Sequence, residues 1–430
     1  MNDRQATAWV DQLQFFTIKL GLDTTIALLA ELGNPQDKLK IIHIAGTNGK
    51  GSVGATLLSI LSAAGYRTGF YSSPHLSSVR ERFRIGDRYI STTDFAQLVT
   101  RLATFLKGRP NPTYFEFTTI LALLWFAEQQ TEAVILEAGL GGRLDATNVA
   151  TPLVSIITDI SRDHEQYLGS TLEAIAGEKA GIIKPNVPVV CAGRAAETIP
   201  VIEARCQQQQ SPLFLYGRDF SGERNNEGGL DYRPISGPDC PHLPLALHGG
   251  HQTINTSLAL AALEILGSVF PVTPQALTEG LQQVRWPGRM ELISVQQQNK
   301  KIRLLLDGAH NEAGVATLIE SLCQGFPRHR LLLIWGNMAD KNMGPVLFEL
   351  MAMADAIILT RAESLRSAIP TSLYEQLSSL AQTKAHCTQT VEQALEMIGQ
   401  MAEPEDLICV AGSLYLVGRV RQLLVGDLAQ

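Results

Sequence analysis

The chain has 430 residues, of which 45% are hydrophobic and 18% are charged, and its net charge is −7. This length favours two domains, and an acidic balance without a basic run argues against nucleic acid as a partner. The N-terminal stretch MNDRQATAWVDQLQFF lacks a signal-peptide pattern, no apolar run is long enough to cross a bilayer, and the cysteines form no C-x-x-C pair. We therefore expect a cytoplasmic protein with reduced thiols, no zinc site and no membrane partner.

Strand-like and helix-like segments alternate along the first half of the chain. The pattern predicts strands at 41–45, 67–72, 132–137, 153–159 and 188–192, and helices at 50–64, 93–107, 115–129 and 171–181. Such alternation indicates a mostly parallel sheet covered by helices. Residues 217–241, rich in Gly, Asn and Pro, interrupt the alternation and are predicted to form an irregular excursion or a hairpin. The stretch HQTINTSLALAALEIL that follows at 251–266 is predicted to be helical.

A second α/β unit follows the short segment RWPGR at 285–289, whose Pro287 and Gly288 suit a domain linker. Strands are predicted near 302–307, 330–335, 355–361 and 406–411, with helices between them. We therefore predict an α/β protein with two domains, at 1–285 and 286–430. The first is expected to be a P-loop ATPase-like domain with a mostly parallel sheet, and the second a smaller, Rossmann-like α/β domain.

The stretch HIAGTNGKGSV at 43–53 places a glycine-rich turn between a buried strand and a helix. Such a turn directs backbone N–H groups and the positive end of the helix at one point, which suits a phosphate. Lys50 would add a full charge, and the Ser52 hydroxyl is placed to reach a magnesium ion. The match to G-x-x-x-x-G-K-[ST] is imperfect, because Gly51 separates Lys50 from Ser52, and a plain tight turn is the alternative interpretation.

Polar residues follow three further strands of the predicted sheet. They lie in YSSPHLSSVRERF, in LEAGLGGRLDATN and in TDISRDHEQYLG. Ligands of open α/β sheets bind beyond the carboxyl ends of the strands, and magnesium takes hard oxygen ligands together with water and phosphate. Ser52, Ser72, Glu137 and His164 are therefore a candidate magnesium set. Taken singly, Glu137 is equally well explained as a solvated strand end and His164 as a helix cap.

The second predicted domain carries its own polar strand ends. Asp307 and His310 lie in LLLDGAHNEAG, and Ser413 lies in VAGSLYLVG, where a strand gives way to a helix. A hydroxyl at a helix start is a ready site for a carboxylate or phosphate, although it is as often an ordinary N-cap. Arg289 in the linker is placed to reach a nucleotide from either domain, or to form an interdomain ion pair.

These motifs together resemble one enzyme family. GTNGKGS, SSPH, EAGLGGRLDATN, DH, GEKAGIIK, WPGR, DGAHN and GSLY occur in the order and spacing of folylpolyglutamate synthases, and in particular of the bacterial form that is also a dihydrofolate synthase. GTNGK is shared with the wider Mur ligase group. The resemblance spans about residues 14 to 424 and implies an ATP-dependent amide ligase, which phosphorylates a carboxylate and lets the amine of L-glutamate displace phosphate. It implies ATP and Mg²⁺ as cofactors, and folate or dihydropteroate, L-glutamate and ATP as small-molecule substrates of a monomer.

The resemblance also assigns roles to individual residues. The ATP phosphates and nucleotide would be held by Gly46, Thr47, Asn48, Gly49, Lys50, Gly51, Ser52, Asn255, Arg289 and Asp307. The metal would be held by Ser52, Ser72, Glu137 and His164, with Lys179 carbamylated beside it. Glutamate would lie at His310 and Ser413. The catalytic residues would be Lys50, Lys179 and His310. The pteroyl group would contact Lys19, Leu20, Gly21, Leu22, Phe115, Glu116, Leu144, Asp145 and Ala146.

Bifunctional members of the family often carry an acid where Lys19 stands. Of the two activities, folylpolyglutamate synthesis and dihydrofolate synthesis, the first is therefore the firmer expectation.

Two other functions compete with a folate-type glutamate ligase. A Mur-type ligase acting on a peptidoglycan precursor would share the mechanism, but about 40 residues before the phosphate loop are too few for a UDP-binding domain. A nucleotide-binding regulator would leave Glu137, His164 and the second domain without a role.

Overall fold

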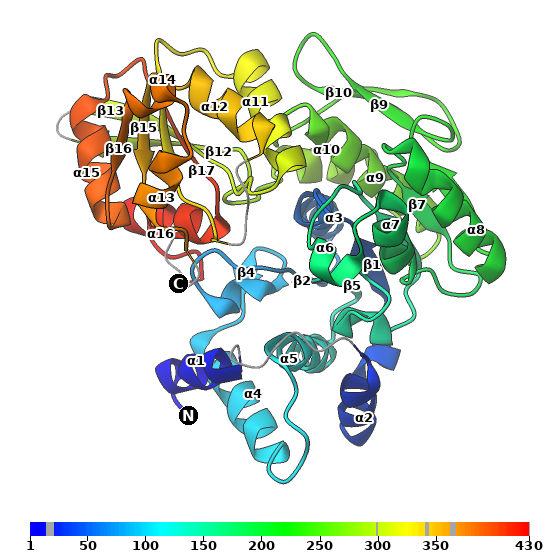
Figure 1. The fold of residues 1–430 in the computed structure, drawn as a ribbon. Coiled ribbons are helices and arrows are strands. Elements are labelled where there is room, and N and C mark those ends of the chain that lie inside the picture. Colours follow the sequence, from blue (N-terminus) through cyan, green and yellow to red (C-terminus); the bar gives the residue numbers. More distant parts are fainter. Residues whose placement is uncertain (14–20, 298–299, 340–343, 362–366, 430) are drawn as a thin grey trace.

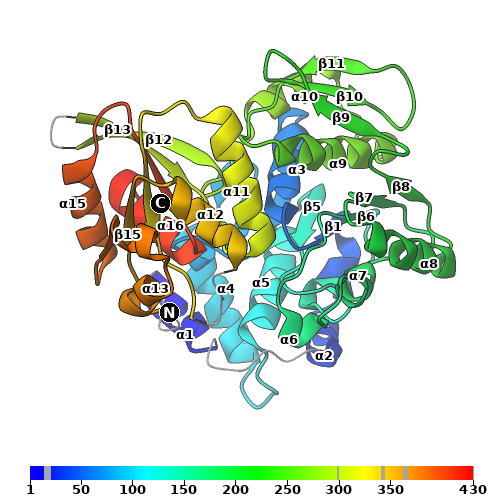
Figure 2. The same cartoon turned by 45° about the horizontal axis from the view of Figure 1, so that its top comes forward.

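The structure is a computed structural model that describes residues 1–13, 21–297, 300–339, 344–361 and 367–429. The molecule consists of two α/β units. The N-terminal unit holds an eight-stranded sheet and the C-terminal unit a six-stranded sheet. In Figure 1 the second unit, coloured yellow to red, lies against the first beside β4 (Arg88–Tyr89). Figure 2 shows α11 (Glu312–Gly325) lying at the side of the second unit that faces the first.

The first sheet is parallel apart from one edge. Its strand order is β4-β3-β2-β5-β1-β6-β7-β8, and β3 and β4 pair antiparallel. The remaining strands are β1 (Ile41–Ala45), β2 (Thr68–Tyr71), β3 (Phe83–Ile85), β5 (Ala133–Glu137), β6 (Val154–Ile157), β7 (Val189–Cys191) and β8 (Leu213–Leu215). Every residue of β1 is buried because helices cover both faces, which explains its mostly apolar sequence; the buried His43 in the middle has its Nε2 2.8 Å from the Thr147 hydroxyl.

Helices on the two faces create separate cores. One face packs against α1 (Asp3–Gln12), α2 (Asp23–Glu31), α4 (Thr92–Phe105) and α5 (Tyr114–Glu128). The other packs against α3 (Lys50–Ala63), α9 (His251–Ile265) and α10 (Pro274–Gln282). Near β7 lie α6 (Glu165–Leu168), α7 (Leu172–Ala180) and α8 (Ile199–Gln209). The buried helix α5 is apolar all round, as expected for a helix enclosed by a large domain.

The second unit has a sheet of order β12-β13-β17-β14-β15-β16, in which only β12 runs antiparallel. Its strands are β12 (Glu291–Gln297), β13 (Lys300–Leu306), β14 (Leu331–Trp335), β15 (Ala356–Leu359), β16 (Ala385–Cys387) and β17 (Leu407–Ala411). Its helices are α11, α12 (Pro345–Met353), α13 (Pro370–Glu375), α14 (Ser379–Gln382), α15 (Val391–Met401) and α16 (Leu414–Val425). Apolar cores lie on both faces of this sheet, as the expected Rossmann-like arrangement requires.

The expected fold class is confirmed, with differences at the sheet edges. Each predicted strand and helix has a counterpart within a few residues, whereas the edge strands β4, β8, β12 and β16, and the strand β3 next to β4, were not expected. The interruption at 217–241 contains a small antiparallel sheet, made of β9 (Ser221–Arg224), β10 (Leu230–Arg233) and β11 (Cys240–Leu243). The boundary at 285 and 286 stays a prediction. Among the described residues, no helix has both the length and the apolar character that a bilayer crossing requires.

Candidate active site

The glycine-rich loop after β1 leads directly into α3. Gly49 caps the helix with φ +91°, and its Cα faces the Asn255 amide of α9 closely enough that a Cβ would collide with it. At Gly46, with φ +153°, a Cβ would overlap the Thr158 hydroxyl. Both positions therefore require glycine. The loop leaves the first N–H groups of a helix of 14 residues open to the cavity, which is the arrangement that binds phosphate.

Lys50 supplies the cation of this loop. Its Nζ donates hydrogen bonds to the carbonyl oxygens of Gly46 at 3.0 Å and Thr47 at 3.1 Å, so the side chain folds back along the loop. Burial lowers the pKa of Lys50, and the Glu137 carboxylate opposes that shift. A buried cation held mainly by neutral carbonyls favours an anionic ligand beside it.

Glu137 ends β5, whose neighbours in the sheet are β1 and β2, so its side chain emerges next to the phosphate loop. The residue is 4% exposed, and its Oε2 accepts the Ser73 N–H at 3.2 Å. Burial raises the pKa of Glu137, while Lys50 acts to lower it. A buried carboxylate lining a cavity, with one hydrogen bond from the backbone, retains lone pairs for a cation.

Lys179 enters the same cavity from the last turn of α7. It is 3% exposed, and burial together with the nearby charge of Lys50 lowers its pKa to about 7. The GLGG loop fixes this end of α7, because the Arg143 N–H donates to the Glu178 carbonyl at 2.7 Å.

The second unit closes the other side of the cavity, whose volume is about 740 Å³. His310 and Ser413 line it, and Ser413 caps α16 by accepting the Tyr415 N–H at 3.2 Å. The His310 Nδ1 lies 2.7 Å from the Gly308 carbonyl, so this nitrogen carries the proton in the neutral ring. The two units thus contribute to one cavity.

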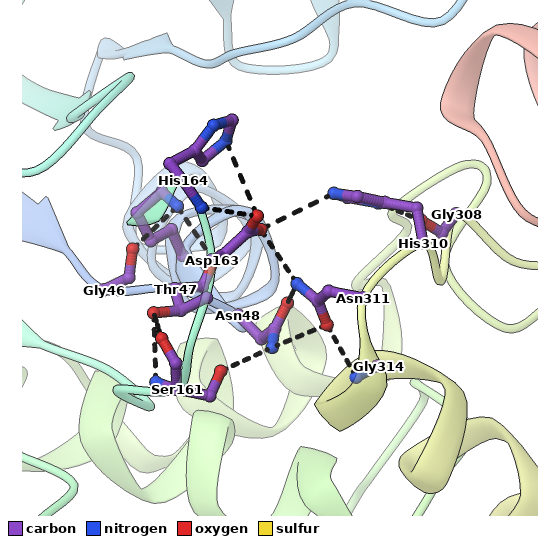
Figure 3. Close-up of polar contacts among 11 residues, drawn as sticks. Gly46, Thr47, Asn48, Ser161, Asp163, His164, Gly308, His310, Asn311 and Gly314 are labelled. Carbon is purple, nitrogen blue, oxygen red and sulfur yellow. Dashed lines mark hydrogen bonds and ion pairs between the residues drawn. The ribbon is translucent and has the colours of Figure 1, made fainter. Parts of the chain in front are cut away.

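A polar network joins the two units across this cavity (Figure 3). The Asn311 Nδ2 donates to Asp163 Oδ2 at 3.0 Å and lies 3.4 Å from Asn48 Oδ1 in the phosphate loop. The His310 Nε2 lies 3.8 Å from the same Asp163 oxygen. Figure 3 shows the Asp163 carboxylate between His310 and His164. The phosphate loop is therefore in direct contact with the second unit.

Asp307 and Arg289 meet at the linker. The Asp307 carboxylate accepts the N–H groups of Met290 at 2.8 Å and Ala309 at 2.9 Å, and Arg289 opposes the rise that burial causes in its pKa. Asp307 therefore fixes the linker against the end of β13. Arg289 lines the cavity and lies close enough to influence the charge of Lys50 and Glu137, which leaves it well placed for a phosphate.

The residues expected at the pteroyl group lie outside this cavity, and Lys19 and Leu20 lie outside the described residues. Glu116 caps α5 by accepting the Thr113 N–H at 2.7 Å. Asp145 accepts the N–H groups of Gly139 at 2.9 Å and Leu140 at 2.8 Å, so its carboxylate orders the GLGG loop. Both acids thus have structural partners. Gly21, Leu22, Phe115, Leu144 and Ala146 remain predictions as pteroyl contacts.

Most of the other expected residues meet in the cavity. The lining includes Gly46, Thr47, Asn48, Gly49, Lys50, Gly51, Ser52, Glu137, His164, Lys179, Asn255, Arg289, Asp307, His310 and Ser413. Ser72 is buried but is not part of the lining. Asp163, Arg194 and Trp286 also line the cavity, although the sequence assigned no individual role to them. The Asp-His pair pointed to Asp163, whereas nothing in the sequence distinguished Arg194.

Comparison with known proteins adds to this geometry. Residues 44–263 match the Mur ligase middle domain, and residues 288–414 match the Mur ligase glutamate ligase domain. The dihydrofolate synthase/folylpolyglutamate synthase of Bacillus subtilis (strain 168) is 33% identical over 98% of this chain and 99% of its own length. The chain belongs to the dihydrofolate synthase/folylpolyglutamate synthase family of Mur ligases.

Solved structures of the family share the whole architecture. The folylpolyglutamate synthase of Mycobacterium tuberculosis, crystallised with ADP and AMPPCP, superposes with a TM-score of 0.89 at 28% identity, over 99% of this chain and 100% of its own. The folylpolyglutamate synthase of Thermotoga maritima is 36% identical, with a TM-score of 0.84 over 99% of this chain and 98% of its own. Both α/β units of the present chain therefore follow the folylpolyglutamate synthase fold.

Proposed function

We propose that this protein joins L-glutamate to folates, and also to dihydropteroate, at the expense of ATP. The single observation that carries the proposal is the shared cavity, in which the phosphate loop of one unit faces His310 and Ser413 of the other. A ligase needs this arrangement, because a carboxylate activated in one unit must meet an amine held by the second. The names of the relatives favour folate over a peptidoglycan precursor as the acceptor.

The first half-reaction transfers the γ-phosphoryl group of ATP to the acceptor carboxylate. A carboxylate oxygen bonds to the γ-phosphorus, the bond to the β–γ bridging oxygen breaks, and ADP leaves. The N–H groups at the start of α3 and the Lys50 ammonium hold the phosphates and offset their charge, which lowers the barrier electrostatically. Arg289 approaches the same phosphates from the linker.

The residues present fit a magnesium ion. Glu137 offers a buried carboxylate oxygen, Ser52 a hydroxyl and His164 an imidazole, all facing the cavity. Among the described residues, no group of three or more His, Cys, Asp and Glu side chains forms a preassembled metal site. That sparse donor set suits Mg²⁺, which keeps several waters and binds substrate phosphates. When bound, the ion would supply positive charge at the transferring phosphoryl group.

Lys179 suits carbamylation. Reaction of an amine with CO₂ needs the neutral form, and a pKa of about 7 leaves much of this amine neutral near pH 7. Burial and the nearby Lys50 charge destabilise the Lys179 ammonium. A carbamate on Lys179 would replace this cation with an anion, which the Lys50 charge would stabilise. We include carbamylated Lys179 in the proposed active form.

In the second half-reaction the glutamate nitrogen bonds to the acyl carbon, the acyl–oxygen bond breaks, and inorganic phosphate leaves with the electron pair. The amine loses a proton as the amide forms. Closure of the units around residues 285–289 would keep water from the acyl phosphate. The Asn48–Asn311–Asp163 contacts supply a junction at which such closure would be held.

His310→Ala is expected to raise the KM for glutamate by about tenfold or more. The His310 ring lines the cavity just before the start of α11, and in the proposed reaction the glutamate amine approaches the acyl phosphate at this place. The KM for ATP is expected to change little, and ATP hydrolysis without ligation is expected to increase. Steady-state kinetics with each substrate varied in turn measures this. His386→Ala, an exposed histidine of β16, is the matched control. A variant that weakened ATP binding alone would contradict the assignment.

The proposed function is tested by incubating purified protein with ATP, L-glutamate and one acceptor, and identifying the products by mass. Glutamylated tetrahydrofolate, formed only with ATP, is the expected result, and glutamylated dihydropteroate would establish the second activity. Product from a UDP-linked muramoyl acceptor alone would favour the peptidoglycan alternative. ATP turnover that no acceptor or glutamate stimulates would favour a nucleotide-binding regulator. The monomeric state and the cytoplasmic location also stay predictions.

A further inference from the structure

The linker holds Arg289 in a backbone turn of unusual conformation. The residues on either side of Arg289 are in the left-handed region, Gly288 with φ +72° and Met290 with φ +49°. Glycine reaches this region without strain, whereas a residue with a side chain, such as Met290, stays there only where the surrounding structure fixes it. Met290 is also buried. The turn that presents Arg289 to the cavity is therefore held by its surroundings.

Two carboxylates hold this turn, one on each side of Arg289. Asp307 Oδ2 accepts the Met290 N–H at 2.8 Å, and Glu291 Oε2 accepts the Gly288 N–H, also at 2.8 Å. Asp307 and Arg289 line the cavity, whereas Glu291 is not part of the lining. Glu291 therefore contacts the backbone of the turn from outside the cavity.

An ion pair with α16 fixes the Glu291 carboxylate in turn. The Arg421 Nε lies 3.1 Å from one Glu291 oxygen and 3.2 Å from the other, and the two side chains are 12% and 19% exposed. Arg421 is itself held, because its Nη1 donates to the Gly426 carbonyl at 3.2 Å. An exposed ion pair stabilises little, but one shielded to this degree, with both partners held, fixes a geometry. Arg421, like Glu291, is not part of the cavity lining.

These contacts attach the turn to the second unit. The Gly308 N–H, at the end of β13, donates to the Gly288 carbonyl at 2.9 Å. Two residues earlier the linker contacts the first unit instead, since a Cβ on Gly51 of α3 would lie 2.6 Å from the Trp286 ring. Arg289 is therefore on the second-unit side of the linker, while the phosphate loop belongs to the first unit. A change in the turn would displace the Arg289 guanidinium relative to that loop.

We propose that Glu291 is a positioning residue, which directs Arg289 at the ATP phosphates by holding the Gly288 N–H. This inference rests on the proposed function. A long arginine side chain loses conformational freedom when it binds a phosphate, and a backbone fixed beforehand reduces that cost. Without the Glu291 carboxylate, the turn keeps Asp307 on one side only, and Gly288 regains the wide backbone freedom of glycine.

The test measures nucleotide binding directly, by calorimetry of the full chain with the β,γ-methylene analogue of ATP. Glu291→Ala is expected to raise the Kd about threefold to tenfold, because both the Gly288 hydrogen bond and the Arg421 ion pair are lost. Glu291→Gln keeps an oxygen for the Gly288 N–H and is expected to raise the Kd less. In steady-state kinetics the KM for ATP should follow the Kd, and the KM for glutamate should stay within about twofold of wild type.

A double-mutant cycle with Arg289 separates positioning from a general structural role. In an Arg289→Met background, Glu291→Ala is expected to change the Kd by less than about twofold, since the side chain through which it acts is gone. A general loosening of the second unit would persist in that background. Arg421→Met removes the ion pair alone and is expected to raise the Kd about twofold to fivefold. It provides the same cycle if Glu291→Ala fails to fold.

Glu392→Ala is the matched control. It removes another glutamate–arginine pair of α16, the pair of Glu392 with Arg419, which has no contact with the linker turn, and it is expected to leave the Kd unchanged. A wild-type Kd in Glu291→Ala would overturn the inference. So would an equal effect in the presence and absence of Arg289, in the Glu291 cycle or, where that variant is insoluble, in the Arg421 cycle. Wild-type protein that bound the analogue but made no glutamylated product would instead refute the proposed function.

Discussion

Replacing Glu137 with glutamine is expected to reduce ligation by about a thousandfold or more while the protein remains folded. Magnesium near a transferring phosphoryl group contributes several kcal/mol of charge stabilisation, and each 1.36 kcal/mol is tenfold in rate. Glutamine keeps the size and one oxygen of Glu137, including an acceptor for the Ser73 N–H, but it lacks the negative charge that the ion prefers. Because burial already raises the pKa of Glu137, the neutral amide is expected to be tolerated in the fold, and the loss should fall on turnover.

The measurement is kcat at saturating substrates over a magnesium titration, with thermal unfolding as the check on folding. Glu132→Gln is the matched control, since Glu132 is an exposed acid just before the same strand and lies at its opposite end from the cavity. Its activity is expected to equal that of wild type. Near-normal turnover of Glu137→Gln at ordinary magnesium concentration would contradict the proposed role of Glu137 in metal binding.

The site could be located from the sequence because, in a parallel sheet, its residues directly follow the strands, and the local sequence pattern shows where each strand ends. Glu137 ends an apolar run, and the loop after Ala45 has the glycines that a turn into α3 needs. The sequence does not contain the strand order, but central strands of one sheet direct their carboxyl ends to the same edge. Polar residues placed there by local pattern alone are therefore expected to meet, and those of the phosphate loop, Glu137 and His164 do.

The features that sequence reasoning missed depend on tertiary contacts. β3, next to one sheet edge, and β12, at the edge of the other sheet, are short or amphipathic strands whose pairing partners are fixed by the sheet and not by local pattern. The motif that contains Asp145 predicts a ligand contact. Only the folded loop shows that the Asp145 carboxylate instead accepts hydrogen bonds from the N–H groups of Gly139 and Leu140. Likewise, Asn311 opens a helix by sequence, and its bond to Asp163 of the other unit follows only from how the units pack.

Lys179 is the residue whose burial has the clearest consequence for stability. Its pKa in the folded protein, about 7, lies below the ordinary value of 10.5 because burial disfavours the charged form. Between these two values the unfolded chain binds more protons than the folded chain, so the free energy of unfolding rises with pH across that window. Below about pH 7 the folded protein carries the full cost of the buried ammonium. Carbamylation would relieve this cost by removing the cation.

Lys179→Met is therefore expected to be inactive, by about a hundredfold or more, and yet more stable than wild type at pH 6 in CO₂-depleted buffer. The gain in melting temperature should shrink as the pH rises from about 7 towards 10.5, because the wild-type lysine becomes neutral in both states. Added bicarbonate should raise the melting temperature and activity of wild type but leave the variant unchanged. Lys184→Met is the control, since its ammonium donates to the Asn148 carbonyl at 2.9 Å; we expect it to lose stability and keep activity. An active Lys179→Met variant would exclude an essential carbamate, and one destabilised equally at every pH would show that the lysine is not strained by burial.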